Sequence, residues 1–288
     1  MTVPGYQVIQ FLGNGARSTI WEVRDRQDGK LYALKRVVKH EAADYRHLEQ
    51  AENEYEIGHQ LDHPVIRHIY QIRRIKKWLA LKEIHVLMEF CLGKTVQADR
   101  PTEIPEILRI FIITGDAVEY MNSCGFVHAD IKPNNIMVAP DRSFKIIDLG
   151  QSCRIGTIKE RIQGTPDFIS PEQVHRRPID IRTDVFNFGA ALYWTLTGRP
   201  IPTVLPKEDS ITFKADLIIK APEEFNAEIP PALSKLVMDS IDQNPSNRPK
   251  SLNEVTSRLR LISKTYEKGF GFFPLPEDQT PTQDQPPQ

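Results

Sequence analysis

The hydrophobic pattern of this chain changes near residue 93 from short, strand-like stretches to long, helix-like ones. The earlier stretches are YQVIQFLG, TIWEVRD, KLYALKRVV, IRHIYQIRRI and IHVLMEF. Runs rich in β-branched and aromatic residues between turn residues are typical of β-strands. The dipeptide Asp28-Gly29 ahead of KLYALKRVV predicts a hairpin turn. We therefore expect a β-rich region up to about residue 90.

Helical periodicity predicts one helix within the β-rich region and several beyond it. The segment 41–61 is the first, and on a helical projection of about 100° per residue one arc collects Leu48, Ala51, Tyr55, Gly58 and Leu61, with Glu54 inside it. The later helices are expected at 105–125, 182–200, 230–243 and 251–263. The helix at 182–200 is apolar nearly all round, which indicates burial. The sequence therefore predicts an α+β protein of two lobes.

Length and charge limit the function classes. The 288 residues are enough for one large domain or two smaller ones, and the net charge of −1 gives no field that attracts nucleic acid or anionic membrane. There is no apolar run of the ~18 residues that a membrane span needs. The three cysteines show no metal or disulfide spacing. We expect a cytoplasmic protein with no nucleic-acid or membrane partner; its oligomeric state is not predicted.

Two short motifs in the β-rich region fit phosphate binding. The stretch GNGARS places Gly13 and Gly15 between two strands, where a bare backbone can approach phosphates closely, although an ordinary hairpin turn explains such a pair as well. Lys35 lies in YALK on the third strand, and it is either an exposed edge lysine or a buried ammonium that needs a carboxylate partner. The helical projection selects Glu54 as that partner, since Glu52 and Glu56 fall outside the core arc.

A dense polar stretch, HADIKPNN, follows the helix at 105–125, and Asp148-Leu149-Gly150 follows the apolar run FKII. If 136–138 and 144–147 pair as strands, then Asp130, Asn135 and Asp148 lie close together. Their hard oxygen atoms suit Mg²⁺, which binds few protein groups together with phosphates. Each piece alone also fits a solvated turn, but their order along the chain favours a single site.

These motifs follow one another in the order found in the eukaryotic-type (Hanks-type) serine/threonine protein kinases. The chain resembles that family from about Tyr6 to Leu261. GNGARS resembles the glycine-rich loop, YALK the strand lysine motif and HADIKPNN the catalytic loop. DLG resembles the metal-binding motif, GTPDFISPE the end of the activation segment (Asp148–Glu172), and TDVFNFG the buried helix beneath the catalytic loop. Arg248 in NPSNRP stands where the family pairs an arginine with the glutamate at Glu172.

The resemblance implies a two-lobed kinase domain at 1–273, with an N-lobe at about 1–88, a hinge at about 89–94 and a C-lobe at about 95–273. A proline-rich tail at 274–288 is expected to be disordered. The implied cofactors are ATP and Mg²⁺, and the implied partners are protein substrates with serine or threonine acceptors. Lys132 and Gly164-Thr165 resemble the residues that kinases of the serine/threonine subtype carry at these positions.

The resemblance also implies roles for individual residues. Asp130 would accept the proton of the substrate hydroxyl or orient it, Lys132 would neutralise the transferred phosphoryl group, and Lys35 would hold the α- and β-phosphates, oriented by Glu54. Asn135 and Asp148 would bind the metal. The implied nucleotide-binding set is Leu12, Gly13, Asn14, Gly15, Ile20, Ala33, Lys35, Met88, Glu89, Cys91, Asn135, Met137 and Asp148.

Four residues depart from the family pattern. Ser18 replaces a glycine, Leu149 replaces a phenylalanine, and Gly58 replaces a bulky residue, so we expect a gap beside Gly58 and a looser helix at 48–60. Ala129 replaces the arginine that reads a phosphate on the activation segment. We therefore expect an activity that depends little on phosphorylation of Thr157.

Three other functions stay open. A pseudokinase would keep the fold without the chemistry, but it usually lacks the strand lysine or one of the two aspartates, and all three are present. A small-molecule phosphotransferase shares the HxDxxxxN loop, but GTPDFISPE and Arg248 disfavour it. The third is a scaffold that acts through its helices.

Thr165 is expected to bond Asp130 or Lys132, and Cys153 is expected to be buried or inert.

Overall fold

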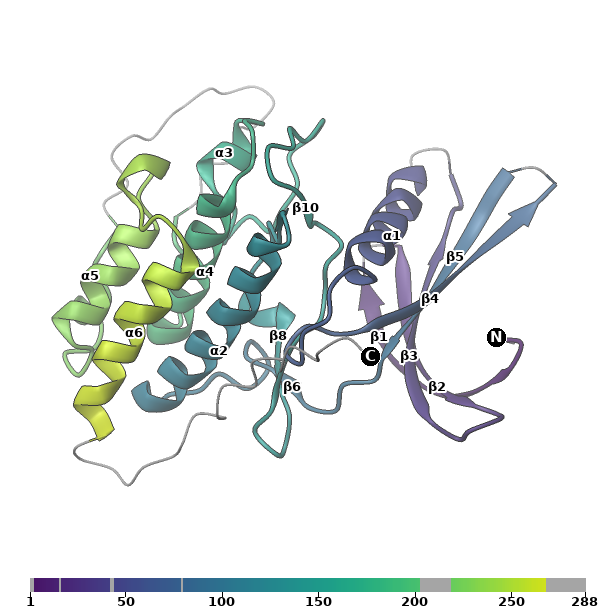
Figure 1. Cartoon of the computed structure of the whole chain (residues 1–288), viewed down its shortest axis with the longest axis horizontal. Coiled ribbons are helices and arrows are strands. Elements are labelled where there is room, and N and C mark those ends of the chain that lie inside the picture. Colours follow the sequence, from purple (N-terminus) through teal and green to yellow (C-terminus); the bar gives the residue numbers. More distant parts are fainter. Residues whose placement is uncertain (1–2, 16, 42–43, 79, 203–218, 268–288) are drawn as a thin grey trace, which may run out of the picture.

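An antiparallel sheet of five strands forms the N-terminal lobe, in the order β1-β2-β3-β5-β4 (Figure 1). The computed structural model describes residues 3–15, 17–41, 44–78, 80–202 and 219–267; the tail expected at 274–288 lies outside them. The strands are β1 (Tyr6–Gly15), β2 (Ser18–Asp25), β3 (Leu31–Val38), β4 (Ile69–Lys77) and β5 (Ala80–Glu89). The hairpin predicted at Asp28-Gly29 is confirmed, with Gly29 at a φ of 72°.

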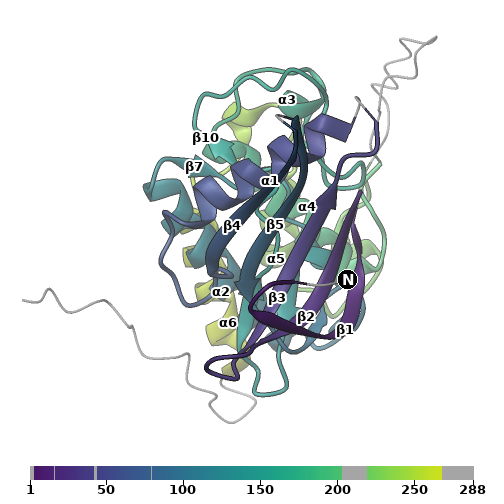
Figure 2. The same ribbon diagram turned by 90° about the vertical axis from the view of Figure 1, so that its right-hand side faces the viewer.

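Helix α1 (Tyr45–Gly58) lies against one face of this sheet (Figure 2). Its apolar residues Leu48, Ala51 and Ile57 share one core with Val37 of β3 and Val86 of β5. A smaller cluster on the sheet joins Val3, Val23, Leu34 and Leu87. The alternation of buried side chains along the strands therefore leaves Lys35 on the same face as Val37, toward α1.

Helices dominate the C-terminal lobe, as the sequence predicts (Figure 1). They are α2 (Ile104–Ser123), α3 (Pro171–Val174), α4 (Ile181–Thr197), α5 (Pro231–Ser240) and α6 (Leu252–Glu267), with short 3₁₀ turns η2 (Pro133–Asn135), η3 (Pro222–Glu224) and η4 (Pro245–Asn247). Short strand pairs are β6 (Lys94–Thr95) with β8 (Ile136–Val138), β8 with β9 (Phe144–Ile146), and β7 (Phe126–Val127) with β10 (Cys153–Arg154). The predicted pairing of 136–138 with 144–147 is confirmed.

Helix α4 is the buried centre of this lobe. Most of its side chains are buried, including Phe186 and Phe188, as the all-round apolar pattern predicts. It ends at Thr197 because Gly198 adopts a left-handed conformation with φ of 70°. The chain passes from the sheet to this lobe between the end of β5 at Glu89 and the start of β6 at Lys94.

The gap expected beside Gly58 is absent, and that expectation was wrong. A Cβ atom at Gly58 would lie 2.8 Å from Cγ1 of Ile69 and 3.3 Å from Cδ1 of Leu149, and closer still to Cδ1 of Ile69. Ile69 from β4 therefore fills the space that a larger residue on α1 would take. The sequence projection followed one helix at a time, and this contact comes from a different element.

Substituting Gly58→Leu is expected to destabilise the protein by about 1–3 kcal/mol, because the new side chain overpacks a full core. Combining it with Ile69→Ala, which makes room, should cost less than the sum of the two single changes. Urea unfolding of the wild type, both single variants and the double variant measures this coupling. Strictly additive losses would contradict the contact.

Candidate active site

The catalytic loop (residues 128–135) is held from beneath by helix α4. The buried carboxylate of Asp184 accepts hydrogen bonds from the backbone N–H of His128 at 2.9 Å and of Ala129 at 2.8 Å. Ala129 is buried and has a φ of 60°, a conformation that residues with a side chain rarely adopt. These bonds hold the loop in a turn that presents the next residue, Asp130.

Asp130 is the hub of a hydrogen-bonded cluster. Its carboxylate accepts bonds from the Lys132 ammonium at 2.6 Å, and from the Thr165 N–H at 3.0 Å and hydroxyl at 2.9 Å. Lys132 also donates to the Thr165 hydroxyl at 2.6 Å, so the expected contacts of Thr165 are confirmed. Burial raises the pKa of Asp130, although Lys132 and Thr165 oppose this. A raised pKa makes a carboxylate a better proton acceptor near neutral pH.

The predicted pair between β3 and α1 is confirmed. The Lys35 ammonium lies 2.6 Å from the Glu54 carboxylate, whose side chain is 2% exposed. Burial alone would lower the pKa of Lys35, but Glu54 and then Asp148 raise it above its ordinary value, so the ammonium stays charged. Glu52 instead bonds Arg74 at the surface, in agreement with the projection that excluded it from the core.

Asp148 offers carboxylate oxygens beside this pair, and Asn135 lies next to the residue before Asp148, since its carbonyl accepts the Ile147 N–H at 3.0 Å. Asp148 lies 3.8 Å from the Lys35 ammonium, accepts the Gly150 N–H at 3.0 Å, and keeps 43% of its side chain exposed. Burial would raise its pKa, but Lys35 and the Gly150 N–H hold it at about 2. The Asn135 amide group donates to the Asp130 carbonyl at 2.9 Å.

These two residues fit a Mg²⁺ ion that shares its coordination with phosphates. Asp148 is ionised at all ordinary pH values, and the donor bond of Asn135 leaves its amide oxygen free of any hydrogen bond from the described residues. Within those residues, no group of three or more His, Cys, Asp or Glu side chains is arranged to hold a metal. A small set of protein oxygen ligands suits Mg²⁺, which usually completes its coordination with phosphates and waters.

The glycine-rich stretch belongs mostly to strand β1. Leu12, Gly13, Asn14 and Gly15 are all in β1, and Gly15 pairs with Ser18 of β2. A Cβ on Gly15 would lie 2.5 Å from the Ser18 hydroxyl, so a larger residue there would have to displace that hydroxyl. Beside the turn, the Arg17 guanidinium pairs with Asp44, just before α1, at 3.0 Å. The sequence analysis missed this link between the two elements.

Four apolar residues of the expected nucleotide-binding set come from four elements. Ile20 is on β2, Ala33 on β3 pairs directly with Met88 on β5, and Met137 is on β8. Glu89, Cys91 and Met137 line a pocket of about 340 Å³ between the hinge and the β8–β9 turn. The side chain of Glu89 bonds Lys145 of β9 at 2.7 Å. Its carboxylate thus ties the hinge to the C-terminal lobe.

The activation segment is braced at both ends. Near its start, Asn53 of α1 donates to the Ser152 carbonyl at 2.8 Å. Near its end, the buried carboxylate of Glu172 forms the expected pair with Arg248, at 2.8 Å. Cys153 is buried as expected, and burial raises the pKa of its thiol. The Thr157 hydroxyl donates to the Arg154 carbonyl at 2.7 Å.

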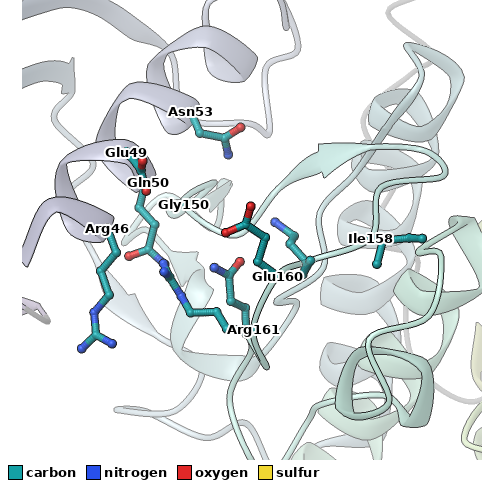
Figure 3. Close-up of a pocket in the computed structure, with 10 residues that line it drawn as sticks. Arg46, Glu49, Gln50, Asn53, Gly150, Ile158, Glu160 and Arg161 are labelled. Carbon is teal, nitrogen blue, oxygen red and sulfur yellow. The ribbon is translucent and has the colours of Figure 1, made fainter. Parts of the chain in front are cut away.

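A pocket of about 240 Å³ separates α1 from the middle of the activation segment (Figure 3). Arg46, Gln50 and Asn53 stand on the α1 side, and Glu160 and Arg161 on the segment side. The pocket is thus lined jointly by side chains of the helix and of the segment.

Sequence reasoning missed two buried polar residues behind the catalytic loop. Asp184 lies within TDVFNFG, where an acid in a nearly continuous apolar run was a usable signal of a buried hydrogen-bonding role. The Asn122 amide supports it by donating to the Asp184 carboxylate at 2.8 Å and to the Phe126 carbonyl at 2.9 Å. Nothing in the local pattern of α2 distinguishes Asn122 from its neighbours.

A five-stranded sheet with one helix, a helical lobe, and a polar cluster built from both define the two-lobed kinase class of fold. The family model described as a protein kinase domain matches residues 6–258. The chain belongs to the protein kinase family.

Several curated relatives carry serine/threonine kinase names. A probable serine/threonine-protein kinase of Clostridium acetobutylicum is 28% identical over 271 residues, which cover 91% of this chain and 40% of that protein. The serine/threonine-protein kinase PknB of Mycolicibacterium smegmatis is 26% identical over 267 residues, covering 88% of this chain and 42% of that protein. An Aurora kinase of Candida glabrata is 26% identical over 254 residues, covering 85% and 69%. The chain thus spans less than half of the two bacterial proteins.

Proposed function

We propose that this chain transfers the γ-phosphoryl group of ATP to serine or threonine hydroxyls of protein substrates. One observation carries the proposal: Asp130, bonded to Lys132 and Thr165, lies beside Asn135, whose amide is 3.5 Å from its carboxylate. Asp148 forms the other half of the site through Lys35. Phosphoryl transfer needs positioning and charge stabilisation more than covalent help from the protein, and these side chains supply both.

In this proposal Lys35, kept charged and oriented by Glu54, binds the α- and β-phosphates. The backbone of Gly13 and Gly15 covers the phosphates. Asn135 and Asp148 would hold Mg²⁺, which would neutralise charge on the phosphate oxygens. The nucleotide set is completed by Leu12, Asn14, Ile20, Ala33, Met88, Met137 and the hinge backbone at Glu89 and Cys91.

Asp130 orients the substrate hydroxyl and takes up its proton. Lys132, which contacts both Asp130 and Thr165, places a positive charge beside the transferred group. Lys132 and Thr165 also support serine or threonine acceptors, as do the names of the bacterial relatives. A cytoplasmic location fits the need for Mg-ATP. No helix among the described residues is long and apolar enough to cross a membrane.

The test is transfer of labelled phosphate from Mg-ATP to a generic protein and, separately, to a small-molecule acceptor. We expect label on the protein, and on serine or threonine after acid hydrolysis. Label only on the small molecule would favour the small-molecule phosphotransferase. ATP binding without transfer to either acceptor would favour a pseudokinase.

The substitution Thr157→Ala is expected to leave kcat within about twofold of wild type, since Ala129 offers no cationic side chain to read a phosphate. Initial rates of both proteins under saturating ATP measure this. The matched change Thr165→Ala removes a hydroxyl that bonds Asp130 and should lower kcat clearly. A large rate loss in Thr157→Ala would contradict independence from phosphate at this residue.

A further inference from the structure

The catalytic loop lacks the arginine that could bond a phosphate, so its links to the activation segment come from other groups, of which Thr165 is one. Ala129 carries no side-chain donor, and a pocket separates α1 from the segment at Glu160 and Arg161 (Figure 3). One contact that joins the segment to the catalytic loop comes from α3.

Gln173 of α3 makes that contact. Its side-chain Nε2 donates to the Ala129 carbonyl at 2.7 Å and to the Gln163 carbonyl at 3.3 Å. One amide group thus joins the catalytic loop to the activation segment. Its Oε1 accepts from the Ser170 N–H at 3.0 Å and from the Asn187 amide at 3.1 Å.

The position of Gln173 is tightly determined. Its side chain is buried, and the residue is 3% exposed. Ser170 and Gln173 also form a reciprocal capping box at the start of α3, and Asn187 comes from the buried helix α4. Because its donor and acceptor atoms are both engaged away from water, losing either bond leaves a buried polar group unpaired.

Both backbone polar groups of Ala129 are therefore held. Asp184 accepts its N–H at 2.8 Å, and Gln173 donates to its carbonyl at 2.7 Å. The left-handed conformation at Ala129 is unfavourable on its own and persists only when its surroundings hold it. The carbonyl of Ala129 belongs to the peptide bond that leads into Asp130, so its orientation sets that of the catalytic aspartate.

We propose that Gln173 is a positioning residue that joins the activation segment to the Ala129 carbonyl and replaces a phosphate–arginine contact with a neutral, permanent one. The inference rests on the proposed function for its kinetic consequence, but the link itself does not. A hydrogen bond donated by a neutral side-chain amide needs no covalent modification and is not screened by salt.

Two nearly isosteric substitutions separate the hydrogen bond from packing. Gln173→Met keeps the length and removes both polar atoms. Gln173→Glu keeps an acceptor, but its ionised form cannot donate to the Ala129 carbonyl. Gln71→Glu, an exposed change on β4, controls for the added charge.

We expect Gln173→Met to lower kcat about tenfold to hundredfold, with KM for ATP nearly unchanged, because the loss falls on the orientation of Asp130. Gln173→Glu should show the same loss at high pH and recover, relative to wild type, as pH falls and the buried carboxyl gains a proton that it can donate. The kcat of Gln173→Met divided by the kcat of wild type should not vary with pH. A pH-independent ratio for Gln173→Glu, or wild-type kcat in a folded Gln173→Met, would overturn the proposal.

Amide hydrogen exchange tests the link without any activity. Gln173→Met should raise exchange about tenfold or more in 128–131 and 160–166, while β3 and β5 keep wild-type protection. Unchanged exchange in both segments, or an equal rise across the whole chain, would overturn the proposal. If wild type transfers no phosphate but exchange rises locally, then the proposed function fails and the positioning contact stands.

Discussion

Replacing Asp130 with asparagine is expected to lower kcat about 10²–10⁴-fold, the usual contribution of a positioned proton acceptor. Asparagine preserves the size of the side chain and can still accept a bond from Thr165. It cannot take a proton from the substrate hydroxyl, and it lacks the charge that holds Lys132 at 2.6 Å. KM for ATP should change little, because the proposed function assigns the nucleotide contacts to Lys35 and Asp148 rather than to Asp130. Steady-state kinetics at saturating Mg-ATP measures both parameters.

Asp141→Asn is the matched control, because it makes the same chemical change on an exposed turn between β8 and β9. It should retain wild-type kcat. If Asp130→Asn kept kcat within a few-fold of wild type while Asp141→Asn behaved normally, then Asp130 would not take part in the chemistry.

Breaking the Glu172–Arg248 pair is expected to cause the largest loss of stability, about 3–5 kcal/mol for Arg248→Met. The Arg248 side chain is fully buried and donates to both Glu172 oxygens, at 2.8 and 3.0 Å. It also bonds the Asp242 carbonyl at 2.7 Å and the Arg182 carbonyl at 2.9 Å. Removing the cation leaves a buried carboxylate and two backbone carbonyls without their partner. Chemical denaturation of both proteins measures the difference.

The exposed helix pair Lys235–Asp239 provides the comparison, since Lys235→Met removes a cation at the surface. That change should cost no more than about 0.5 kcal/mol. A double variant, Glu172→Gln with Arg248→Met, should be less destabilised than the two single losses added together. Equal losses for Arg248→Met and Lys235→Met would contradict the buried pair.

The Glu172–Arg248 pair also predicts how the stability of the protein changes with pH. Burial would raise the pKa of Glu172, but its bonds to Arg248 hold that pKa below its ordinary value. A carboxyl whose pKa is lowered by folding stabilises the protein above its unfolded pKa of about 4.3, and this contribution is lost as pH falls below that value. Arg248→Met should therefore lose less stability than wild type on acidification.

The parts of the fold that local patterns determine were predicted well. Alternation and helical periodicity depend on neighbours along the chain, so the strands, the α1 core face and the buried α4 were all predictable. The Lys35–Glu54 pair followed from the same reasoning, because a buried ammonium requires a partner and only one acid faced the core. The family resemblance, supported by ordered motifs, extended the predictions to the roles of the other site residues, and these roles stay predictions.

Contacts between distant elements were not predictable in the same way. Ile69 fills the space beside Gly58 because β4 brings it there, and no periodicity within α1 reveals this. Gln173 reaches the Ala129 carbonyl from a helix far along the chain, and its signal in the sequence was only a glutamine beside Glu172. Ala129 marked a missing side-chain donor in the sequence, but the bond from Gln173 to its carbonyl became visible only in the packed structure.

The most direct test of the account is the rate of phosphoryl transfer by protein that carries no phosphate. The purified chain would be treated with phosphatase, shown unmodified by intact mass, and assayed with Mg-ATP and a serine- or threonine-containing protein, beside Asp130→Asn. We predict immediate transfer well above Asp130→Asn, at a rate within about threefold of that after full autophosphorylation. Transfer no faster than that of Asp130→Asn would contradict the proposal that the chain is an active kinase. A long lag that ends with autophosphorylation would contradict the proposal that the activation segment is held in place without a phosphate.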